Sequence, residues 1–261
     1  MTRAAGKMYI VLIQVPYFMF YSTVYLNSLL ETMHWSQPKI VGDIPPPCRA
    51  HTATLVDRKI VVFGGGQGPT YYDKTYVLDT TLRRWIKCKI QGTVPAPRRA
   101  HTAVLYRGKI WIFGGGNGMQ ALNDTWTLDV GNGLENMKWE KVETRGRKPS
   151  ERGYHTANLI GNVMIVLGGS DGRECFSDVW CLNLGMLSTD HHIIECLLII
   201  FADNSVWSMV KLEQDYRRLS HSSTQVGSYL FVVGGHDGTS YTSELLLYNL
   251  GAFSDIRCTF Q

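Results

Sequence analysis

The sequence predicts an all-β protein built from about four copies of a four-stranded unit, the architecture of a β-propeller blade. Three observations predict this fold. The 261 residues include 26 glycines, seven tryptophans and 13 tyrosines, a mixture typical of short strands and tight turns. A histidine followed by Thr or Ser recurs along the chain. A Gly-Gly doublet follows each of these histidines at a nearly constant distance.

Each unit contains four short strands, which we call A to D in chain order. Strand A begins at a histidine, and the histidines are 50, 54 and 66 residues apart. An apolar strand B then leads into the glycine doublet, strand C ends near Asp or Asn, and strand D begins with tryptophan. Four short strands in about 50 residues make one propeller blade. The recurring residues are His51, Gly64, Gly65, Trp85, His101, Gly114, Gly115, Trp139, His155, Gly168, Gly169, Trp207, His221, Gly234 and Gly235.

We expect these recurring residues to be structural. A histidine at one position in every blade is expected to form a hydrogen bond that closes the turn between strands D and A. The glycines would avoid a collision with the neighbouring blade or adopt a positive φ. The tryptophans would cover the contact between blades.

The His-Thr-Ala start, the Phe-Gly-Gly doublet, the Leu-Asp pair and the trailing Trp resemble kelch repeats over roughly residues 35–250. This resemblance implies a kelch-type propeller. The simple Phe-Gly-Gly-Gly units look most like cytoplasmic kelch scaffolds of fungi and other eukaryotes, which act in polarity, cytoskeletal organisation and small-GTPase signalling. The resemblance therefore implies a cytoplasmic, non-catalytic scaffold. An alternative is a substrate-receptor propeller for ubiquitin ligation, which would need a BTB or F-box segment.

The repeat divides the chain into an apolar segment at 1–34, repeats at 35–91, 92–144, 145–212 and 213–250, and a tail at 251–261. Residues 8–30 carry no charge and are long enough to cross a bilayer. They are a membrane anchor, a local packing segment or sequence derived from an intron. Residues 35–41 read as a lone D strand that would close the ring with the last blade, where no D strand is evident. Since kelch relatives more often have six or seven blades, we expect an incomplete propeller.

Residues 185–202 lengthen the third unit. Without these 18 residues the longest histidine spacing falls from 66 to 48, and Leu184 joins Asp203 in the usual pattern between strands C and D. The segment is either a loop insertion, which propellers tolerate, or a retained intron.

The B–C loops carry residue types that anchor protein interfaces. We expect a protein or peptide partner to contact Tyr71, Tyr72, Met119, Arg173, His236 and Tyr241. We expect the D–A loops on the opposite face, where their arginines would form a basic rim for an acidic peptide or would stabilise the turns. These arginines are Arg49, Arg98, Arg99, Arg152, Arg217 and Arg218.

Other function classes find little support. The net charge of +4 comes from scattered residues, whereas nucleic-acid binding usually requires a basic stripe. The six cysteines form no CxxC motif and are read as reduced thiols of the cytosol or nucleus. We predict no catalytic residue, cofactor or metal.

Two patterns in the sequence offer metal binding as an alternative. Kelch-type specifier proteins bind iron through a Glu-x3-Asp-x3-His motif. Glu174 and Asp178 match its first two positions, but Leu182 stands where the histidine would be. His191, His192 and Glu195 also lie close together, inside the 185–202 insertion.

Overall fold

A computed structural model describes residues 36–185, 205–210, 212 and 214–250. The expectations for the anchor at 8–30, most of the insertion and the tail at 251–261 lie outside these residues. Within the described ranges, no helix has the length and apolar character needed to cross a membrane.

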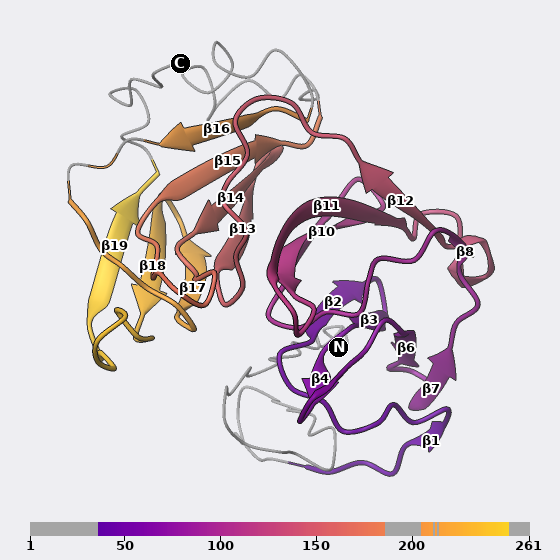
Figure 1. Cartoon of the computed structure of the whole chain (residues 1–261). Coiled ribbons are helices and arrows are strands. Elements are labelled where there is room, and N and C mark those ends of the chain that lie inside the picture. The colour runs from indigo at the N-terminus through magenta and orange to yellow at the C-terminus, as the bar shows by residue number, and fades with distance from the viewer. Residues whose placement is uncertain (1–35, 186–204, 211, 213, 251–261) are drawn as a thin grey trace, which may run out of the picture.

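The described chain is all-β, and its four main sheets follow one another around an arc with the first (indigo) and fourth (yellow) at opposite ends (Figure 1). This confirms the predicted bladed fold. Blade one contains β2 (Thr52–Val56), β3 (Lys59–Phe63), β6 (Thr75–Asp79) and β7 (Arg84–Lys87). Blade two contains β9 (Thr102–Tyr106), β10 (Lys109–Gly116), β11 (Ala121–Asp129) and β12 (Lys138–Val142). Blade three contains β13 (Thr156–Ile160), β14 (Val163–Leu167), β15 (Val179–Asn183) and β16 (Trp207–Val210). Blade four contains β17 (Ser222–Val226), β18 (Tyr229–Val233) and β19 (Leu245–Asn249).

Strands A to D of blades one to three, and the three described strands of blade four, pair as antiparallel neighbours. The B–C loop of blade one adds the short hairpin β4 (Gly66–Gln67) and β5 (Thr70–Tyr71), and a 3-10 turn (Leu134–Asn136) precedes β12. Side chains along strand B point alternately to the two faces of the sheet. Val61 and Phe63 face blade two, and Ile60 and Val62 face the opposite side. Both faces of the sheet are therefore apolar, as stacked blades require.

A short strand before blade one, and another before blade two, pairs with the outer strand of the blade that follows it. β1 (Val41–Gly42) runs parallel to β7, and β8 (Gln91–Gly92) runs parallel to β12. The prediction that residues 35–41 supply a D strand to the last blade is therefore wrong. Gly42 explains the contact, because it has a φ of 93° and a Cβ there would lie 2.1 Å from the Trp85 carbonyl oxygen.

The D–A and B–C loops lie at the same end of the blades, which corrects the expectation that they occupy opposite faces. Arg49 bridges to Gly66, and Arg99 bridges to Gly116. Because strands A and B are antiparallel, the start of A lies beside the end of B. We call this end of the molecule the loop end.

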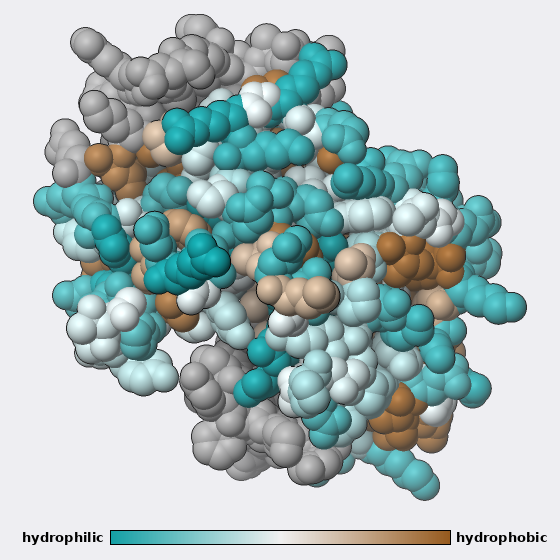
Figure 2. All heavy atoms as spheres, in the orientation of Figure 1, coloured by the Kyte–Doolittle hydropathy of each residue, from teal (hydrophilic) through white to brown (hydrophobic). Residues whose placement is uncertain are grey.

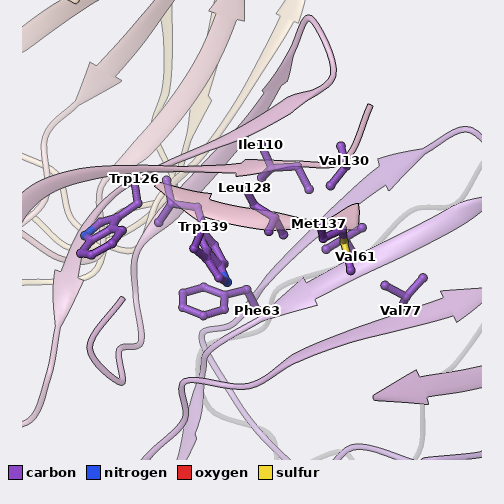
Figure 3. Close-up of a cluster of buried hydrophobic side chains, with 10 residues drawn as sticks. Val61, Phe63, Val77, Ile110, Trp126, Leu128, Val130, Met137 and Trp139 are labelled. Carbon is purple, nitrogen blue, oxygen red and sulfur yellow. The ribbon is translucent and has the colours of Figure 1, made fainter. Parts of the chain in front are cut away.

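Apolar layers between consecutive blades form the core. The rings of Phe63 in blade one and Trp139 in blade two lie against each other, with centroids 4.7 Å apart (Figure 3). Phe113 and Trp207 repeat this contact between blades two and three at 4.8 Å. The outer tryptophan of each of these blades therefore packs on strand B of the blade before it.

Candidate functional site: the loop end

The histidine that recurs in each repeat forms contacts between blades. Thr52 Oγ1 lies 2.8 Å from His101 Nε2, and Thr102 Oγ1 lies 2.9 Å from His155 Nε2. Thr156 and His221 repeat the pair at 2.9 Å. Each of these bonds joins two consecutive blades, so the prediction that the histidines close the D–A turn is wrong.

Burial keeps these histidines neutral. It is the main reason why the pKa of His101 is well below 6.5, and nearby Arg98 lowers that pKa further. The pKa of His155 falls to about 3 and that of His221 to about 4, again mainly through burial. Neutral imidazoles suit a hydrogen bond to a hydroxyl, so the threonine–histidine pairs explain the repeated histidine as a structural contact.

The glycine doublets also contact the next blade. Gly64 has a φ of 69°, and a Cβ there would lie 2.7 Å from the Arg98 carbonyl oxygen. The Gly65 N–H donates to that same carbonyl at 2.8 Å. Both reasons anticipated for glycine, positive φ and close approach, therefore apply at this position.

A buried arginine and an acid 26 residues later cross-link the loop end of three blades. Arg98 has a fully buried side chain that donates to both Asp124 carboxylate oxygens, at 2.7 and 2.8 Å. Arg152 pairs with Asp178 in the same way, and Arg218 pairs with Glu244. Sequence analysis missed these pairs, although the constant spacing of 26 was a usable signal.

These pairs remove three arginines from the predicted basic rim. Arg98, Arg152 and Arg218 are 0%, 0% and 4% exposed. The Arg98 guanidinium, its hydrogen bonds and the Trp126 Nε1–H hold the pKa of Asp124 below 3.8 against the opposing effect of burial. These side chains stabilise the loop end, and they are not available to a partner.

Blade one departs from this pattern. Cys48 occupies the arginine position and Lys74 the acid position, as the same spacing of 26 shows. A cavity of about 30 Å³ remains, lined by Pro45, Pro46, Cys48, Val62, Gly64, Tyr72, Lys74 and Tyr76. This volume is enough for a water molecule or a small group. Burial raises the pKa of the Cys48 thiol to about 11, so the thiol is protonated and is a poor nucleophile.

Tyr71, the residue before Tyr72 of the cavity lining, packs against Arg99 and the next B–C loop. The Arg99 guanidinium lies 4.5 Å from the centroid of the Tyr71 ring. The Tyr71 ring lies against Gly118 of the next B–C loop, where an added Cβ would be 2.9 Å from the ring. Asn117 Oδ1 accepts hydrogen bonds from the Met119 and Gln120 N–H groups, which fixes the loop tip. Met119 is 93% exposed.

The predicted partner-binding residues therefore all lie at the loop end, but they do not form one group. Tyr71, Tyr72 and Met119 lie around blades one and two. Arg173 follows Asp171, whose carboxylate caps its N–H in an exposed turn. His236 and Tyr241 pack edge to face with centroids 4.9 Å apart, and Tyr241 is 74% exposed.

The iron-motif positions serve the fold. Asp178 is held by Arg152 and by the Trp180 Nε1–H, and Leu182 is fully buried. Among the residues that the structure describes, no three His, Cys, Asp or Glu side chains are grouped to hold a metal. His191, His192 and Glu195 lie outside those residues.

These repeated blades, with their inter-blade histidines and glycine doublets, define a β-propeller repeat protein. The family model of the KLHDC2/KLHL20/DRC7 Kelch-repeats domain matches residues 17–188, and a Kelch motif matches residues 217–252. The chain belongs to the kelch-repeat family.

Several curated proteins are similar to this chain. Acyl-CoA-binding domain-containing protein 4 of Arabidopsis thaliana is 28% identical over 87% of the chain and 41% of its own length. Host cell factor of Drosophila melanogaster is 28% identical over 82% of the chain and 12% of its own length. Tip elongation aberrant protein 1 of Schizosaccharomyces pombe is 26% identical over 44% of the chain and 9% of its own length. The chain thus spans less than half the length of these relatives.

Proposed function

We propose that this chain is a non-catalytic interaction platform that binds a protein or peptide through the loop end of blades one and two. The observation that carries the proposal is the packing of Tyr71 against Arg99 and Gly118, one residue before the exposed Met119. Aromatic residues, arginine and methionine are the types enriched at interface cores. Tyr71 and Arg99 are already packed on each other, so these two side chains would lose little conformational entropy on binding.

The cavity in blade one also supports a partner site at the loop end. In blades two and three an arginine from the loop fills the equivalent space, whereas in blade one it is open and lined partly by the exposed side chain of Lys74. A short partner side chain could enter beside Tyr72. Lys74 favours an acidic group next to it, although Asp73 already pairs with Lys74 at 2.9 Å.

The finer role that we propose is a scaffold in cell polarity or cytoskeletal organisation, located in the cytoplasm. Its support is the similarity to a protein whose name refers to tip elongation, together with the simple kelch units of this chain. A role as a substrate receptor in ubiquitin ligation is the alternative, and no contact at the loop end favours it.

The test compares proteins captured from cells of the source organism by the full chain and by two variants. The first variant changes Met119 and Tyr71 to alanine. The matched control changes Leu82, which is 67% exposed in the turn after strand C at the other end of blade one. We expect Y71A/M119A to lose one or more partners that L82A keeps. Identical partner sets for all three proteins would contradict the proposal.

A further inference from the structure

The blade-one cavity lies where a guanidinium is bound in blades two and three. In blade three, Arg152 donates to the carbonyl oxygens of Ser150 and Gly168, both at 3.0 Å, and to the carboxylate of Asp178. Arg98 forms the same set of bonds in blade two. The residues of blade one at the four equivalent positions all line the cavity, and they are Pro46, Cys48, Gly64 and Lys74.

The backbone around the cavity follows the same course as in blade three. Gly64 has a φ of 69°, and its N–H donates to the Lys74 carbonyl at 3.3 Å. Gly168 has a φ of 61°, and its N–H donates to the Asp178 carbonyl at 3.1 Å. The carbonyl oxygens of Pro46 and Gly64 should therefore face the cavity, as their counterparts in blade three face the arginine. No described side chain replaces the arginine as a donor to these two oxygens.

An aromatic ring forms one wall of the cavity. In blade three the guanidinium carbon of Arg152 lies 4.4 Å from the centroid of the Phe176 ring. Tyr72 stands at the equivalent position, 24 residues after Cys48, and it lines the cavity. Because an aromatic face stacks with a planar polar group in blade three, it suits a planar polar group in blade one as well.

The charge of the cavity is reversed relative to its counterparts. Lys74 replaces the acid, and its ammonium pairs with Asp73 at 2.9 Å. An ammonium has three N–H donors, so this pair leaves donors for another acceptor. The Cys48 thiol adds no charge, because burial raises its pKa to about 11. The cavity therefore offers two carbonyl acceptors, one cationic donor and an aromatic wall.

The size of the cavity limits what can enter it. Its volume of about 30 Å³ has room for roughly two groups of the size of a water molecule. Figure 2 shows a mostly hydrophilic face of the molecule, on which apolar atoms form separate patches. A small polar group is thus a more suitable anchor on this protein than a large apolar side chain.

We propose that this cavity binds the side-chain carboxamide of an asparagine or glutamine of the partner, an inference that rests on the proposed partner site. The planar amide carries two N–H donors for the carbonyls of Pro46 and Gly64, and its oxygen accepts from Lys74. A carboxylate has no donor for the two carbonyls, so an acidic group would pair with Lys74 only outside the cavity. A guanidinium would bring a second cation against Lys74.

The test titrates the full chain with small probes, so it does not require an identified partner. Acetamide, acetate and methylguanidinium are added separately while NMR follows the backbone amide signals of Gly64 and Lys74. We expect saturable shifts with acetamide and about tenfold weaker binding of the other two probes, because each leaves a polar group of the cavity without a partner. The absence of a saturable shift with acetamide, or equal binding of either other probe, would overturn the proposal.

Two variants with the same change of charge test the assignment of the cavity. Lys74→Asp restores the acid of the other blades, so this variant should prefer methylguanidinium to acetamide. Lys89→Asp is the matched control at an exposed residue outside the cavity, and it should keep the preference for acetamide. A K74D variant that still prefers acetamide would overturn the proposal.

The probe titrations and the capture experiment fail independently. If Y71A/M119A loses partners but acetamide causes no saturable shift, the carboxamide site is wrong and the proposed function stands. If acetamide binds as expected but all three proteins capture identical partners, the cavity chemistry is supported and the proposed function is contradicted.

Discussion

The two kinds of arginine site predict different costs for the same substitution. Arg152→Met removes a fully buried guanidinium that bonds to Asp178, Ser150 and Gly168. Asp178 is only 28% exposed and would keep only the Trp180 N–H among these partners. Breaking a buried pair by removing one partner typically costs about 3–5 kcal/mol. We expect Arg152→Met to lower the free energy of unfolding by about this amount.

Arg218→Met should cost much less. Its partner Glu244 has a side chain that is 64% exposed, so water can replace most of the lost interaction. Because Arg218→Met leaves no buried charge without a partner, its cost should approach that of an exposed pair, about 1 kcal/mol or less. Urea unfolding followed by tryptophan fluorescence would measure both midpoints, with R152M/D178M as the control because it leaves no unpaired charge. The reasoning is refuted if R218M costs as much as R152M, or if the double variant is no more stable than R152M.

Three further predictions follow from the structure. C48R/K74D should give blade one the arginine–acid pair that the other blades have. It should raise the urea midpoint, and it should weaken partner capture because the arginine fills the cavity. A lower midpoint would show that the blade-one backbone cannot hold the pair. The free energy of unfolding should fall as the pH drops from about 6.5 toward 4. Histidines of the unfolded chain take up protons in this range, whereas His155 in the folded protein stays neutral down to its pKa of about 3. Each such histidine contributes a slope of up to about 1.4 kcal/mol per pH unit. His155→Gln should flatten this slope in urea titrations run at several pH values, and an unchanged slope would contradict the assignment. Gly118→Ala should displace the Tyr71 ring and reduce partner capture. The thermal midpoint should fall by only a few degrees, because the site is an exposed loop. Full capture would show that binding does not need this position of the ring.

Sequence periodicity was sufficient to predict the blades because each local signal agrees with the others. The apolar run before Gly114, the tight turns and Trp139 all require a short strand at the same place in each unit. The Thr52–His101 bond was not predicted, because each repeat was read by itself and the bond crosses to the next one. The position of the D–A loops was predicted wrongly for a similar reason, since it depends on how antiparallel strands A and B align in space.

The blade-one site shows what sequence reading leaves out. A cavity is the absence of a side chain, and Cys48 and Lys74 are unremarkable residues when each is taken singly. They become informative only when the pairs at spacing 26 in the other blades show what that place normally holds. Blade one thus lacks the cross-link that stiffens its neighbours, while the Tyr71–Arg99 stack beside it is ordered by contacts with blade two. Blade one is the copy that departs from the shared pairing at spacing 26, which is why we propose the partner site there.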